Sequence, residues 1–175
     1  MDHWKDRALR SLENGIRACV APSRPPLECD RWIASSTLQK AIRRGEIETA
    51  QRAALTLYTN DRSGVWRRLI AIAFEDVGPA DVALVVETVA VATAPEWRAQ
   101  HGDTRALFYL THRIAEAPKD RSADYLMWAT SAHPSLDRMR RLCASIPMAE
   151  RREICRDLPI YTALSECPRN LPRPP

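Results

Sequence analysis

The strongest constraint on the fold is a helical hydrophobic period, broken only by very short turns, that runs through residues 36–81. Ser36, followed by Gln at the third position after it, is a capping-box pattern and predicts a helix over residues 36–44. Gly45 can adopt a left-handed conformation and end that helix. Because a second helical pattern follows at once over residues 46–58, the two helices are expected to form an antiparallel hairpin.

Other parts of the chain show the same period. Apolar residues at three- and four-residue steps predict helices over residues 3–20, 65–76, 103–117 and 122–132, a short helix or turn over 95–103, and two short basic helices over 135–144 and 149–157. Residues 59–64 have the composition of a turn. The valine-rich run 80–94 would allow a strand, but it is too long and lacks strict alternation, so it predicts a buried central helix.

These patterns predict an all-α protein. Every predicted element is helical, most connections are short, and no repeat of 20–50 residues is visible. Hydrophobic residues make up 45% of the chain, which is enough for a packed core. A multi-helix bundle is therefore the expected fold class.

Proline-rich segments indicate how the chain is divided. Three prolines between residues 22 and 26 forbid a helix there and predict an extended linker. We therefore expect an N-terminal helical arm with its linker over residues 1–30, a helical domain over 31–160 and a proline-rich, disordered C-terminal tail over 161–175.

Cysteine usage and charge indicate the compartment. The five cysteines are odd in number and show no CxxC spacing, which favours reduced thiols inside a cell. The N-terminal residues lack the apolar segment of a signal peptide, and no apolar run approaches the ~18 residues that a membrane span needs. The protein is expected to be cytoplasmic, without membrane contact. A net charge of +4 permits nucleic-acid binding but does not require it.

Catalytic motifs are missing from the sequence. It has no GxxxxGK[ST] phosphate-binding loop, no GxGxxG and no HExxH. Glu75 and Asp76 are adjacent, so on a helix they point about 100° apart and make a poor acid–base pair. We expect one of them to partner an arginine and the other to cap the next helix. The predicted protein is not an enzyme and needs no cofactor or metal.

A basic cluster offers the one candidate binding surface. If their two helices pack side by side, one face could carry Lys40, Arg43, Arg44, Arg67 and Arg68, which would suit contact with nucleic-acid phosphates. The alternative is a solvated face with ion pairs such as Arg44–Glu48. Of the five tryptophans, Trp66 and Trp128 are expected in the core, whereas Trp4 and Trp32 could anchor the N-terminal arm or mark a partner interface.

Three segments resemble a known family. They read LQKAIRRG from residue 38 with AALTLY from residue 53, RRLIAIAFEDVGPAD over residues 67–81, and APKDRSADY over residues 117–125. In that order they resemble the C-terminal helical domain of the replication-associated recombination protein A family, which includes the bacterial MgsA proteins and the eukaryotic Werner-helicase-interacting ATPases. The matching positions include Leu69, Glu75, Asp76, Gly78, Asp81, Pro118, Lys119 and Tyr125.

The resemblance implies a clamp-loader collar-like helical domain that assembles tetramers and is joined to an AAA+ ATPase acting at stalled replication forks. This chain has no Walker motif, so ATP hydrolysis does not carry over, and Phe74 stands where the family has serine. The first hypothesis is a non-enzymatic module for oligomerisation and interaction in DNA replication, recombination and repair. The alternative is a mobile-element or phage regulatory protein that binds a host AAA+ or replication partner.

Overall fold

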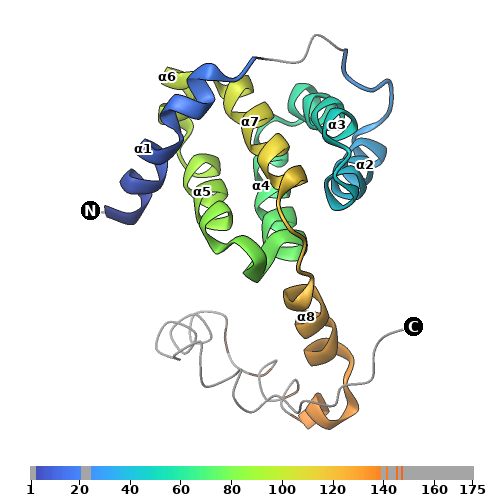
Figure 1. Ribbon diagram of the computed structural model, residues 1–175. Helices are drawn as coiled ribbons and strands as arrows, with labels where there is room; N and C mark the ends of the chain where they lie inside the picture. Colours follow the sequence, from blue (N-terminus) through green and yellow to red (C-terminus); the bar gives the residue numbers. More distant parts are fainter. Residues whose placement is uncertain (1–2, 21–24, 139–140, 142–144, 146, 148–175) are drawn as a thin grey trace. The chain divides into compact units, whose positions relative to one another are not determined.

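The computed structural model describes residues 3–20, 25–138, 141, 145 and 147. All secondary structure within these residues is helical (Figure 1). The α-helices are α1 (His3–Ala18), α2 (Arg31–Arg44), α3 (Ile47–Asn60), α4 (Arg62–Ile72), α5 (Val82–Ala92), α6 (Pro95–His101), α7 (Asp103–Glu116) and α8 (Ser122–Ala132). Shorter turns are π-helical at Ala73–Val77 and 3₁₀ at Gly78–Asp81 and Pro134–Leu136. The all-α prediction is confirmed.

The chain divides into two units after Asp124. The first unit is a bundle of α1–α7 together with the first residues of α8. The second begins at Tyr125 and includes the rest of α8. The basic helix predicted over 149–157 and the tail predicted over 161–175 lie outside the described residues, as does much of the basic helix predicted over 135–144.

The core of the first unit comes from the predicted apolar stripes. Its largest fully buried side chains include Leu12, Ile16, Leu38, Ile42, Leu69, Ile72, Leu84, Leu107, Leu110 and Ile114. Helix α1 packs against α5, α6 and α7, and α3 packs against α2, α4 and α7. Each helix therefore buries one face against several partners, and this joint burial holds together helices that are too short to be stable alone.

The hairpin of α2 and α3 forms as predicted, but α2 begins earlier than the capping box indicates. Asp30 is the N-cap, and its Oδ1 accepts hydrogen bonds from the backbone N–H groups of Trp32 at 2.7 Å and Ile33 at 3.0 Å. Aspartate is among the best N-cap residues, so the helix begins at its first good cap and Ser36 lies in the interior. Gly45, at φ 73°, ends α2 as predicted.

The turn predicted over residues 59–64 is reduced to Asp61. This residue ends α3 and caps α4, because its Oδ1 accepts a hydrogen bond from the Gly64 N–H at 2.7 Å. The helix predicted over 65–76 also differs, since α4 ends at Ile72 and a π-helical turn follows. Gly78 closes that turn at φ 47°, where a Cβ atom would lie 3.0 Å from the Asp120 carbonyl oxygen.

Two predictions of burial need correction. Helix α5 buries Leu84 and Val91, but Val82 is 60% and Val86 38% exposed, so only one face of this helix is in the core. Trp66 is buried as predicted, whereas Trp128 is 66% exposed because α8 buries none of its residues. Within the described part of the chain, no helix is long and apolar enough to cross a membrane.

Candidate functional site

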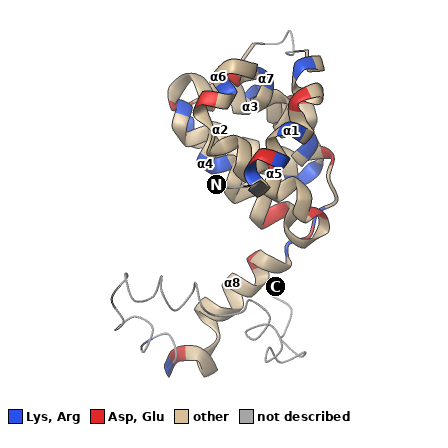
Figure 2. Ribbon diagram, turned by 90° about the vertical axis from the view of Figure 1, so that its left-hand side faces the viewer, with Lys and Arg blue, Asp and Glu red and all other residues tan. Residues whose placement is uncertain are grey.

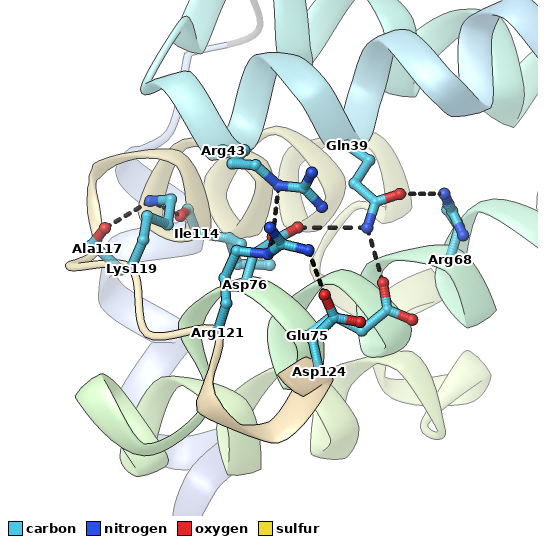
Figure 3. A network of polar contacts seen from close by, with 10 residues as sticks. All are labelled: Gln39, Arg43, Arg68, Glu75, Asp76, Ile114, Ala117, Lys119, Arg121 and Asp124. Carbon is cyan, nitrogen blue, oxygen red and sulfur yellow. Dashed lines mark hydrogen bonds and ion pairs between the residues drawn. The ribbon is translucent and has the colours of Figure 1, made fainter. Parts of the chain in front are cut away.

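A buried carboxylate organises the polar contacts between α2 and the π-helical turn. Asp76 is completely buried, and its Oδ1 accepts a hydrogen bond from Arg43 Nε at 2.7 Å (Figure 3). Arg121 Nε lies 3.5 Å from the same oxygen. Gln39 Nε2 donates a longer bond of 3.4 Å to Oδ2. A buried charge needs such partners, and the two guanidinium groups neutralise it.

Gln39 extends these contacts to α4. Its Nε2 donates to Glu75 Oε2 at 2.7 Å, and its Oε1 accepts from Arg68 Nη2 at 2.6 Å (Figure 3). The expectation that one of the two adjacent carboxylates pairs with arginine is correct for Asp76. Glu75 does not cap the next helix, because that cap is Asp81, which accepts from the Leu84 N–H at 2.9 Å.

The segment after α7 completes the network. Lys119 Nζ donates to the backbone oxygens of Ile114 and Ala115, both at 2.9 Å, and so caps the C-terminus of α7. Burial lowers the pKa of Lys119, although the nearby Asp76 opposes this. The Asp120 N–H donates to the Asp76 carbonyl oxygen at 3.0 Å.

The eight residues that match the resembled family in sequence fall into two groups. Those that lie in the core, cap helices or meet at the π-helical turn are Leu69, Glu75, Asp76, Gly78, Asp81 and Lys119. Pro118 and Tyr125 are exposed. The residues of the first group stabilise the bundle and hold α2, α4 and the start of α8 in register.

A groove lies between α2 and α4, beside this network. Its volume is about 360 Å³, and its lining consists of Arg31, Trp32, Ser35, Leu57, Asp61, Gly64, Val65, Arg67, Arg68 and Ala71. The charged groups among these residues are three guanidinium groups and one carboxylate. We call this hollow the arginine groove. Its excess of positive charge makes it a candidate for binding an anion.

The single carboxylate of the groove is already engaged by the protein. Asp61 accepts from the Gly64 N–H at 2.7 Å and from Ser63 Oγ at 3.1 Å. The backbone bond is the largest cause of its lowered pKa, which the charges of Arg67 and Arg31 lower further. Arg67 Nη2 lies 3.8 Å from Asp61 Oδ2, and the Arg67 side chain is 73% exposed. The Arg67 guanidinium is therefore only weakly held and can meet an incoming anion.

An exposed indole borders the same groove. Trp32 is 72% exposed, and the guanidinium carbon of Arg31 lies 4.7 Å from its ring centroid. This cation–π contact covers one face of the ring. From the sequence, Trp32 was expected only as an anchor or interface residue, and Arg31 was not expected at a site. Recognising Asp30 as the N-cap of α2 would have set both residues on the first turn of this helix.

The predicted basic face is not assembled as one surface. Arg43 and Arg68 belong to the buried network, with Arg68 also lining the groove, and Arg67 lies at the groove. Lys40 is exposed on α2, and Arg44 lies 3.8 Å from Glu46 across the turn. Figure 2 shows Lys and Arg positions spread over several helices of the first unit. Of the five predicted basic residues, Arg67 and Arg68 line the groove.

A metal site finds no support in the described residues. Among the residues that the structure describes, no group of three or more His, Cys, Asp or Glu side chains could hold a metal ion. No protein-family model matches the chain, and no curated protein is similar to it in sequence.

Proposed function

We propose that this protein is a non-enzymatic helical interaction module of DNA replication, recombination or repair, and that it contacts the DNA backbone through the arginine groove. The observation that carries the proposal is the gathering of Arg31, Arg67 and Arg68 around a hollow whose only carboxylate, that of Asp61, is bound to its own helix. Planar guanidinium groups match the geometry of phosphate oxygens, and their contacts with DNA release condensed counterions.

The arrangement of Arg68 favours binding. Its Nη2 donates to Gln39, and Gln39 is held in turn by Glu75. Arg68 therefore loses little side-chain freedom when it meets a phosphate, which reduces the entropic cost of association. Arg31 is restricted by its contact with the Trp32 ring.

The link with replication and repair comes from the family-like segments. The order of the residues over 67–81 and 117–125 resembles the collar-like domain of the replication-associated recombination ATPases. In this chain several of those residues stabilise the helices that carry the groove. This supports a related scaffold for an interaction module, without the ATPase part.

Equilibrium binding with matched double variants tests the proposal. A fluorescein-labelled DNA of about 20 nucleotides, as single strand and as duplex, is titrated with protein over a series of salt concentrations and followed by anisotropy. Arg31→Ala/Arg67→Ala and Lys40→Ala/Arg44→Ala each remove two positive charges, the first pair from the groove and the second from the exposed side of α2.

The groove variant is expected to lose most of the affinity. Each lost phosphate contact reduces the slope of log K against log salt by roughly 0.7–0.9, so the slope should fall by about 1.5. The Lys40/Arg44 variant should keep a slope near that of the wild type. Equal losses in both variants would mean that net charge alone attracts DNA, and would contradict a role for the groove.

A second candidate function is protein binding through α8. Tyr125 is 50%, Met127 56% and Trp128 66% exposed, which is a large apolar surface for one short helix. Such residues are typical of interfaces. The occupant could be a second copy, as in a tetramer, or a host AAA+ or replication partner of a mobile-element or phage regulatory protein.

Light scattering on a sizing column over a concentration series separates these two occupants. A stable mass near four times 19.8 kDa supports self-assembly into a tetramer. A monomer at all concentrations excludes self-assembly and leaves a different protein as the occupant of α8.

A further inference from the structure

The arginine groove is bordered by an aromatic side chain that phosphate binding alone does not need. Trp32 exposes 72% of its surface at the first turn of α2, next to the groove that Arg67 and Arg68 line. Exposing an indole to water is unfavourable, and an aromatic ring beside guanidinium groups is the arrangement that binds unpaired bases. We infer that the groove binds single-stranded nucleic acid, with one base stacked on Trp32 and the adjoining phosphates held by Arg31, Arg67 and Arg68.

The inference rests on the proposed function and names the form of nucleic acid that the groove takes. Arg31 lies over one face of the Trp32 ring, with its guanidinium carbon 4.7 Å from the ring centroid. This contact restricts the ring and leaves its other face as the stacking platform. The ring is therefore partly oriented before a base arrives.

The shape of the site favours a single strand over a duplex. The groove is a concave hollow of about 360 Å³ between two helices, at the small end of the range for ligand sites. Duplex DNA is read by an element that protrudes into its groove, and its bases are stacked on one another. An unpaired nucleotide can turn its base toward an exposed ring without breaking a base pair. The hollow thus suits one nucleotide of a flexible strand.

Stacking on Trp32 implies tolerance of sequence. Every base has an aromatic face, and the groove offers mainly guanidinium donors, which bind the backbone that all sequences share. The expected ligand class is therefore single-stranded DNA or RNA of any sequence, bound in a salt-dependent manner.

The test compares three ligands with three proteins. The ligands are a labelled thymidine homopolymer of about 12 nucleotides, a strand of the same length with abasic sites in place of the bases, and the corresponding duplex. The proteins are the wild type, Trp32→Ala and Trp32→Phe. Because Trp32 is exposed, both variants are expected to keep the wild-type helix content and unfolding midpoint.

The wild type should bind the homopolymer more tightly than the duplex or the abasic strand. Trp32→Ala should weaken binding of the homopolymer by roughly fivefold to a hundredfold, which is the range for losing one stacked base. It should leave binding of the abasic strand and the salt slope unchanged, because no phosphate contact is removed. Trp32→Phe keeps an aromatic face and should retain most of the affinity.

Two failures are distinguishable. If the duplex binds as tightly as the single strand, or if Trp32→Ala has no effect on the homopolymer, the stacking inference is wrong while DNA binding by the arginine groove still stands. If neither form of DNA binds at low salt, the proposed function and this inference fail together.

Discussion

Replacing Asp76 by Asn should destabilise the first unit far more than the same change at its neighbour. Asp76→Asn keeps the shape of the side chain and removes a charge that is completely buried. Arg43, at 2.7 Å, and Arg121, at 3.5 Å, would then face a neutral amide, although Arg121 keeps its ion pair with Asp124. Removing one partner of a buried ion pair costs about 3–5 kcal/mol when the remaining charge stays buried.

The surroundings of the two arginines lower this cost. Their side chains are 35% and 31% exposed, so each can recover part of its hydration when the carboxylate is lost. We therefore expect a loss of about 2–3 kcal/mol in the free energy of unfolding, below the range for fully buried pairs. With a urea m-value of about 1.5 kcal/mol per M, the unfolding midpoint should fall by about 1.3–2 M.

The matched control is Glu75→Gln. It also replaces one carboxylate by an amide of the same shape, but Glu75 is only half-buried and accepts one bond, from Gln39 at 2.7 Å. Its loss should cost no more than about 1 kcal/mol. Urea unfolding followed by circular dichroism measures both variants. Midpoint shifts that agree within error would refute the reasoning, because burial of the Asp76 charge would then contribute nothing specific.

Two further predictions concern other carboxylates. Asp61→Asn keeps a good N-cap on α4 and removes the only negative charge among the residues that line the arginine groove. DNA affinity should therefore rise by about twofold near 0.1 M salt. Unchanged or weaker binding, measured by anisotropy, would contradict the assigned site. Burial raises the pKa of Asp103, but hydrogen bonds from Tyr58, Arg62 and Arg98 outweigh burial and leave it below its usual value of 3.8. Its contribution to stability is therefore complete above about pH 4 and is lost as the pH falls through the lower folded-state pKa. Asp103→Asn should show a smaller difference between urea midpoints at pH 7 and pH 3 than the wild type, and an unchanged difference would show that this carboxylate does not cause the acid sensitivity.

Local signals in the sequence were enough to predict the helical segments of the described residues and several of their ends. Gly45 has no competitor as the stop of α2, and the bounds of α8 follow from Ser122 and the break at His133. The start of α2 was missed because Asp30 and Ser36 are both good caps. A local pattern does not decide between them, whereas burial of Ala34 in the folded bundle does.

The site was harder to predict because its contacts are not local. Arg43 and Asp76 are far apart in sequence, and nothing near Ala73–Val77 signals a π-helical turn. The five basic residues were grouped by type, but only the packing of α2 against α4 decides which of them face the groove. The exposure of Trp128 could not be predicted for a similar reason. An apolar helix pattern indicates which side chains favour burial, but it does not show whether another element packs against them.

The order of the Asp76 partners along the chain bears on how the protein forms during synthesis. Gln39 and Arg43 leave the ribosome before Asp76, but Arg121 follows about 45 residues after it. At roughly 5–20 residues per second, this interval lasts about 2–9 s. During that time the carboxylate has only one of its two cations, and α7, which packs on α2 and α3, is still being made. The nascent α2–α4 segment therefore has to stay soluble while Asp76 lacks its second guanidinium partner. That partner, Arg121, is among the last residues of the first unit.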